Sequence, residues 1–236
     1  MSSHYILQIE TATQVCSVAL AVNGETLVFR DVNEPNVHAS MLTRLIAEIL
    51  REAGVGFGDL SAVAVSKGPG SYTGLRIGVS TAKGLCYAAD LPLIGVDTLR
   101  GMAAGFGAVH PEVSEPYTRL YPMIDARRME VYMAAYNPAL QLIQPVSAVV
   151  MDAQTFGTLD ADERIVLFGS GADKLHALYS DHRQIDVIQG FLNSARYFSC
   201  QAYQAFLSNE FEDVAYMEPF YLKDFVATKP KASPSA

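Results

Sequence analysis

The first third of the chain combines two hydrophobic periods, one typical of strands and one typical of helices. Residues 5–9 are rich in β-forming side chains, and residues 15–22 alternate between two faces, as half-buried strands do. Asn23-Gly24 comes next. Because both residues tolerate positive φ, the pair predicts a hairpin that returns as a third strand over 26–32. The opening of the chain therefore predicts an antiparallel meander.

A helical period follows the meander. Over residues 38–53, large apolar side chains recur three and four residues apart, charged ones lie on the other faces, and Gly54 suits the helix end. The elements expected after it are a strand at 60–65, a glycine-rich turn, a helix at 73–89, a strand at 93–96 and a helix from 98 toward 104, capped by Asp97 or Thr98. Strands joined through helices pair in parallel. We therefore expect an α/β fold whose mixed five-stranded sheet has ribonuclease H-like topology and is covered by helices.

The pattern of the opening recurs in the second half. The strands expected at 120–124 and 130–136 repeat the plan of an apolar strand that ends in an acid, a short polar turn and a second strand. Glu10 and Asp125 stand at corresponding points. The turn 125–128 puts an acid beside two arginines and predicts exposed ion pairs. Two hairpins of one design, a domain's length apart, indicate an internal repeat.

Glycine, proline and acidic residues between 105 and 116 indicate a domain boundary. We expect a first domain at 1–105, a smaller second domain at 106–227 and a flexible tail at 228–236. The further elements expected are a short helix at 153–159, a strand at 165–168, a helical segment at 172–179, a strand at 184–188 and a strong helix at 194–208, which can pack back on the first domain.

Composition restricts the class of protein. The chain has 236 residues, half of them hydrophobic and 18% charged, which is enough for a sizeable core. The net charge of −8 and the lack of a basic stripe disfavour nucleic-acid binding by the chain alone, although a partner could supply a positive surface. Cys16, Cys86 and Cys200 are far apart, so buried thiols are expected. With no signal sequence or membrane-spanning run recognised, a cytoplasmic protein is expected.

Glu10-Thr11 closes the first strand and raises the question of a bound nucleotide. In an actin-like nucleotide-binding domain, a carboxylate at this point would hold Mg²⁺ through water, with a glycine-rich hairpin around the phosphates. The hairpin that follows here contains no glycine. The alternative is a turn in which Thr11 and Thr13 hydrogen-bond to the backbone.

The stretch 67–78, KGPGSYTGLRIG, has the composition of a phosphate loop without its spacing. It matches neither GxxxxGK[ST] nor GxGxxG, and its proline removes one backbone N–H. We interpret it as a strand-to-helix corner, with Ser71 or Thr73 as the helix cap and Gly74 and Gly78 on one face of the helix. This smooth face predicts either docking on a second helix or subunit, or close packing within its own domain.

The sequence contains no local catalytic constellation. The five histidines form no HxxxH or HExxH pair, so no metal site is predicted. There is no GxSxG elbow, and no cysteine has a suggestive setting, so no nucleophile is predicted.

Several segments occur in a highly specific order and spacing: ILQIETAT, KGPGSYTGLRIG, LIGVDTL, PMIDARRMEVYMAAY and EPFYLKDF. In this order they closely resemble the TsaB (YeaZ) family, a bacterial component of the machinery that makes threonylcarbamoyladenosine at position 37 of tRNAs. The resemblance implies an actin-like fold of two related domains. It also implies that the chain is a non-catalytic paralogue of TsaD. Such a paralogue would bind TsaD and support it in modifying tRNAs that read ANN codons.

The resemblance implies partners and cofactors as well. TsaD, the catalytic subunit, would carry metal, and the ATPase TsaE would complete the assembly, so ATP, Mg²⁺ and metal are expected in the partner subunits and none in this chain. The resemblance further implies that the chain forms a homodimer in the absence of TsaD. It also implies that the chain meets tRNA only through the complex and does not contact a membrane. The alternatives are an ATP-dependent actin-like phosphotransferase and, as older family names have it, a metallopeptidase.

In the family, the first two helices of the N-terminal domain form the subunit interface, and here these match 38–53 and 73–89. By itself the apolar face of 41–50 predicts either a core helix or one that offers an edge to a partner. The interface residues expected are Met41, Leu42, Leu45, Ile46, Ile49, Tyr72, Leu75, Arg76, Val79 and Lys83. A vestigial nucleotide site would comprise Glu10, Thr11, Gly68, Gly70 and Ser71.

Overall fold

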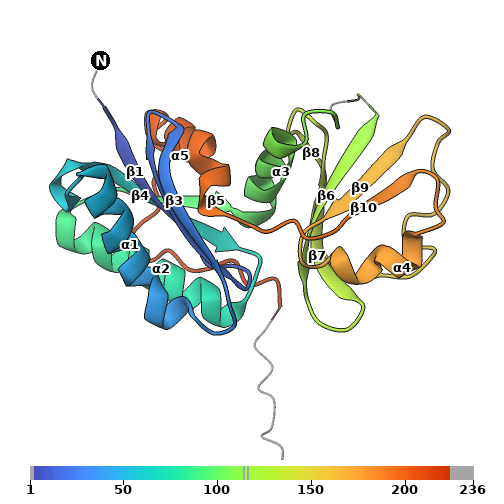
Figure 1. Ribbon diagram of the computed structural model, residues 1–236, viewed down its shortest axis with the longest axis horizontal. Helices are drawn as coiled ribbons and strands as arrows, with labels where there is room; N and C mark the ends of the chain where they lie inside the picture. Colours follow the sequence, from blue (N-terminus) through green and yellow to red (C-terminus); the bar gives the residue numbers. More distant parts are fainter. Residues whose placement is uncertain (1–2, 114, 116, 224–236) are drawn as a thin grey trace, which may run out of the picture.

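The structure is a computed structural model that describes residues 3–113, 115 and 117–223, so the tail predicted at 228–236 lies outside it. Within the described residues, the strands form two mixed five-stranded sheets that lie side by side, each covered by helices (Figure 1). The first sheet ends with residue 97 and the second begins with residue 118. The boundary expected at 105 therefore falls inside the helix between the sheets, α3 (Thr98–Val109).

The first sheet has the strand order β3-β2-β1-β4-β5. Its strands are β1 (Tyr5–Glu10), β2 (Val15–Val22), β3 (Glu25–Asn33), β4 (Leu60–Gly68) and β5 (Leu93–Asp97). The first three pair antiparallel, whereas β4 pairs in parallel with both β1 and β5. Asn23 and Gly24, at φ 52° and 88°, make the predicted hairpin between β2 and β3. The mixed sheet expected from the sequence is thus confirmed.

The helices of the first half begin or end at residues that are typical helix caps. They are α1 (His38–Ala53), a 3-10 turn (Phe57–Asp59), α2 (Tyr72–Ala89) and α3. Gly54 ends α1 in the left-handed region, at φ 66°. Ser71 caps α2 by accepting a hydrogen bond from Gly74 N at 3.3 Å, and Asp97 caps α3 by accepting one from Arg100 N at 3.0 Å.

Alternation along the strands sends side chains from the first sheet into two cores. On one face, Leu7 and Ile9 of β1 pack with the apolar faces of α1 and α2. On the other face, Ile6 packs with a 3-10 turn (Ala195–Phe198) and with α5 (Ser199–Leu207). Figure 1 shows α5 on the opposite side of this sheet from α1 and α2. After the second sheet is complete, the chain therefore returns to cover the first.

The second sheet repeats the topology of the first, with the order β10-β9-β6-β7-β8. Its strands are β6 (Thr118–Asp125), β7 (Glu130–Tyr136), β8 (Leu142–Val150), β9 (Arg164–Phe168) and β10 (Ile185–Ile188). The first three again pair antiparallel, and β9 pairs in parallel with both β6 and β10. The expectation of two related domains is confirmed by this shared pattern.

Several details of the second half differ from the prediction. The helix expected at 194–208 begins as the 3-10 turn Ala195–Phe198 and is α-helical only in α5. Strand β8 was missed, because its side chains are half-exposed on both faces and Pro145 interrupts the pattern. The helix expected at 153–159 is a series of turns. The helical segment expected at 172–179 divides into a 3-10 turn (Asp173–Leu175) and the four-residue α4 (His176–Tyr179).

Cys16 and Cys86 are buried as expected, but Cys200 is exposed, because it faces outward from α5. In the part of the chain that the structure describes, no helix is long and apolar enough to cross a membrane.

Candidate functional site

Glu10 ends β1 in the interior of the molecule, with 1% of its surface exposed. Its Oε1 accepts hydrogen bonds from Ala12 N at 2.6 Å and from Ser66 Oγ at 2.9 Å. Burial raises the pKa of this carboxyl to about 7, and the hydrogen bonds oppose the shift only in part. Glu10 is therefore a buried group whose charge the fold disfavours.

The glycine-rich turn after β4 closes over this acid. Ser71 N donates to Ala12 O at 2.7 Å, and Gly68 N donates to Thr98 Oγ1 at 3.2 Å. A Cβ at Gly70 would overlap Ala12, so the two turns are in direct backbone contact. Two backbone N–H groups that a bound phosphate would need are thus already bonded to acceptors of the protein itself.

The structure brings the residues of the expected vestigial nucleotide site together. Thr11 is fully buried beside α2, where a Cβ on Gly74 or Gly78 would overlap its carbonyl or hydroxyl oxygen. Among the described residues, no group of three or more His, Cys, Asp or Glu side chains is placed to hold a metal ion. The strand-end site is consequently packed with the protein's own atoms.

A cavity of about 650 Å³ lies beside this closed turn, between residues 212–220 near the C-terminus and residues of both sheets. The carboxylates that line it are those of Asp97, Glu212, Asp213 and Glu218. Among the described residues that line it, Lys67 supplies the basic group and is paired with Glu212 at 3.1 Å. The excess of carboxylates disfavours a polyphosphate ligand here.

The expected interface residues of α1 are mostly unavailable for contact. Leu42, Leu45, Ile46 and Ile49 are at most 2% exposed, because this face packs on the first sheet. Of the residues named on this helix, Met41 alone is half-buried rather than buried. The apolar face of α1 is therefore the core face, and the expectation that it meets a partner is wrong for these four side chains.

On α2 the expected interface residues divide in the same way. Leu75 and Val79 are buried, so they too are corrected from contact residues to core residues. Tyr72 and Lys83 are half-buried, and Arg76 is exposed. The outward face of α2 comprises Arg76, small residues such as Ser80 and Gly84, and the exposed ring of Tyr87.

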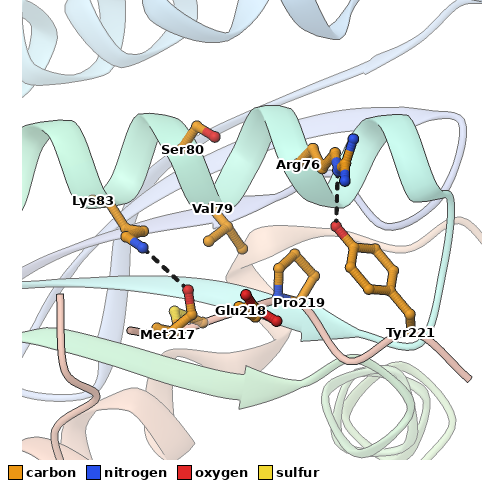
Figure 2. Close-up of a pocket in the computed structure, with 8 residues that line it drawn as sticks. All are labelled: Arg76, Val79, Ser80, Lys83, Met217, Glu218, Pro219 and Tyr221. Atoms are coloured by element: carbon orange, nitrogen blue, oxygen red, sulfur yellow. Dashed lines mark hydrogen bonds between the residues drawn. The ribbon is translucent and has the colours of Figure 1, made fainter. Parts of the chain in front are cut away.

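The C-terminal segment, residues 212–223, lies along one edge of this face. Lys83 Nζ donates to Met217 O at 3.2 Å, and Arg76 Nε donates to the Tyr221 hydroxyl at 3.2 Å, as Figure 2 shows. The Tyr221 ring also contacts Tyr72, with 4.6 Å between ring centroids. A cavity of about 300 Å³ remains between the segment and α2. The place of this segment could not be predicted from the sequence, since contacts between residues 134 and 145 positions apart leave no local period.

The paired five-stranded sheets with this shared topology define an actin-like fold. The activator of 2-hydroxyisocaproyl-CoA dehydratase from Clostridium difficile has a TM-score of 0.52 at 8% identity, which bears on the fold alone. The structure of "YeaZ from Pseudomonas aeruginosa" is more similar, with a TM-score of 0.75 and 27% identity over 94% of this chain and 100% of that one.

The sequence comparisons define the family. The family model described as "TsaD: tRNA N6-adenosine threonylcarbamoyltransferase" matches residues 35–218. The "tRNA threonylcarbamoyladenosine biosynthesis protein TsaB" of Bacillus subtilis is 31% identical over 92% of this chain and 93% of that protein. The proteins of the same name from Escherichia coli and Haemophilus influenzae are 41% and 35% identical, over 56% and 57% of this chain and 54% of each protein. The chain thus matches about half the length of these two relatives. It belongs to the TsaB (YeaZ) family.

Proposed function

We propose that this chain is a non-catalytic subunit of the machinery that adds the threonylcarbamoyl group to adenosine 37 of tRNA, and that it binds and supports TsaD. The observation that carries the proposal is the match to TsaB over 92% of the chain. The closed turn is consistent with it, because Ser71 N and Gly68 N bond to the protein itself. ATP, Mg²⁺ and metal would then act in TsaD and TsaE, and tRNA would be modified there.

The outward face of α2, next to α1, is the docking surface that we propose. It presents Arg76, Ser80 and Gly84, with Met41 of α1 half-buried nearby. Small side chains let another helix approach closely, and an arginine beside them can fix its orientation. In the absence of TsaD, the same surface would serve a homodimer.

The first experiment is to purify the chain with its cognate TsaD and to assay threonylcarbamoylation of tRNA with and without the chain. We expect a stable complex in gel filtration and loss of modification when the chain is left out. Full modification without the chain, or no complex, would refute the proposal.

A pair of matched variants locates the surface. Ser80→Glu puts a charge on the outward face of α2, whereas Ser180→Glu makes the same change at an exposed position in the second half. A long charged side chain obstructs the close approach of another helix to this small-residue face, so the first variant should bind TsaD at least about tenfold more weakly. The second should bind as the unaltered chain does. Equal affinities for the two variants would place the docking surface elsewhere.

A further inference from the structure

The hairpin between β6 and β7 holds two adjacent arginines in an unusual backbone conformation. Arg127 has φ 74° and Arg128 has φ 50°, in the left-handed region that L side chains rarely adopt. Backbone bonds order this turn, from Ala126 N to Glu130 O and from Glu130 N to Arg127 O, each 3.1 Å. Asparagine or glycine would suit these φ values better. The fold therefore does not explain why arginine stands at both positions.

The charges around the hairpin leave both arginines uncompensated. Asp125 pairs with Lys174, and Glu130 pairs with Lys223 of the C-terminal segment. Arg127 and Arg128 are exposed, and among the described residues neither guanidinium has a hydrogen-bond or ion-pair partner. The prediction of ion pairs between the acid and the arginines of this turn is therefore wrong, because the acids pair with lysines from elsewhere in the chain. A chain of net charge −8 thus presents two adjacent free cations here.

We propose that Arg127 and Arg128 contact the phosphate backbone of tRNA when the chain is part of its complex. The inference rests on the proposed function. Guanidinium groups bind phosphate oxygens through two parallel N–H···O bonds, and such contacts position a nucleic acid without reading its sequence. The contact would be direct, which goes beyond the expectation that tRNA is reached only through the partner subunits.

The charge of the hairpin favours RNA over a neutral protein surface. The proposed docking face lies on α2 of the first half, and the C-terminal segment links it to this hairpin of the second sheet, through Tyr221 to Arg76 and through Lys223 to Glu130. The rest of the acidic chain repels RNA, so a local cationic hairpin is the form that a limited contact with RNA would take.

The test measures binding of fluorescently labelled, unmodified tRNA to the complex of this chain with TsaD, by anisotropy at several salt concentrations. The variant R127N/R128G removes both charges and suits the turn, so it should fold at least as stably as the unaltered chain. We expect its complex to bind tRNA about tenfold more weakly near 0.1 M salt. The slope of log K against log salt should fall by roughly 1.4 to 1.8, the amount expected for two lost phosphate contacts.

Arg183→Gln is the control. Arg183 is exposed just before β10 begins. Because β6, β9 and β10 run parallel, Arg183 lies near the starts of these strands, whereas the hairpin follows the end of β6. Its loss should leave the affinity for tRNA within about twofold and the salt slope unchanged.

Each outcome decides the question. An R127N/R128G complex that binds tRNA with unchanged affinity and salt slope overturns the proposal. A variant that no longer binds TsaD overturns it as well, since the hairpin would then contact protein. If the unaltered chain itself forms no complex with TsaD, the proposed function fails. Binding of tRNA by the isolated chain at low salt then decides for the hairpin: weaker binding by the variant supports the contact with RNA, and equal binding excludes it.

Discussion

Helix α2 carries three glycines in different surroundings, and they give the sharpest test of how this helix is used. A Cβ at Gly74 would overlap the backbone carbonyl of Thr11, and one at Gly78 would overlap the Thr11 hydroxyl, whereas one at Gly84 meets no atom within 4 Å. Alanine at an open helical position stabilises a protein by about 0.5–1 kcal/mol. Overpacking against a backbone atom, which cannot rotate away, costs about 1–3 kcal/mol.

We therefore expect Gly84→Ala to raise the free energy of unfolding by about 1 kcal/mol and Gly74→Ala to lower it by about 2 kcal/mol. Gly78→Ala should fall between the two, because the Thr11 side chain that it meets can rotate. For a chain of this size, 1 kcal/mol corresponds to about 2–4 °C in Tm, so thermal and urea unfolding resolve the difference. Equal shifts for Gly74→Ala and Gly84→Ala would refute the close approach of α2 to the end of β1.

A second substitution on the same helix distinguishes packing within the chain from docking on a partner. Gly84→Gln adds a side chain to the outward face, where the chain itself offers no obstacle. Stability should change by less than about 1 kcal/mol, while affinity for TsaD should fall. If the affinity is unchanged, Gly84 lies outside the docking surface.

Three further predictions concern the strand-end site and the C-terminal segment. Burial raises the pKa of Glu10 from 4.5 to about 7, so the fold favours the protonated carboxyl. The contribution of Glu10 to stability should be complete below pH 4.5 and fall by on the order of 3 kcal/mol as pH rises to 7, which urea titrations detect as the difference between the unaltered chain and Glu10→Gln. Calorimetry should show Mg-ATP binding weaker than ~100 μM, about −5.5 kcal/mol, and tighter binding would argue for the phosphotransferase alternative. Tyr221→Ala should speed proteolysis of the segment 212–223, whereas the exposed control Tyr87→Ala should not.

The sequence predicted the elements of the first half better than it predicted the use of their surfaces. Helix 38–53 and its end at Gly54 follow from local signals, and the structure has both. From the sequence, the large apolar residues of this helix, such as Leu45 and Ile49, could belong either to the core or to an interface with a partner. Burial against a sheet and burial against a subunit select the same side chains. The sheet takes these residues, and only the fold could decide that.

The second half was harder to predict because its contacts are less local. Edge strand β8 has no buried face to set a clear period of two. Met217 joins the first core and accepts a hydrogen bond from Lys83, yet acidic residues surround it in sequence. Such a segment is recognisable only after the elements that it crosses have been placed.

The repeat itself accounts for the different roles that we assign to the two halves. Glu10 and Asp125 end the central strands of their sheets, and each accepts a hydrogen bond from the backbone N–H two residues later, Ala12 N at 2.6 Å and Arg127 N at 3.0 Å. The turn-forming bond is thus the same in both halves. Their exposure differs, since Glu10 is buried and the Asp125 side chain is half exposed.

The segments that cover the two strand ends explain that difference. In both halves a glycine-rich turn follows the neighbouring strand and contacts the first hairpin, through Ser71 N to Ala12 O at 2.7 Å and through Gly171 N to Met123 O at 3.0 Å. In the first half, α2 then runs for 18 residues beside Thr11, and Asn193 of the segment that returns from the second sheet hydrogen-bonds to the acid. The second half has only the short segment that contains α4. Lacking that cover, the second hairpin stays at the surface, where its acid needs Lys174 and its arginines are free to meet an anion. One topology therefore yields a closed, helix-covered half suited to docking and an open half suited to contact with phosphate.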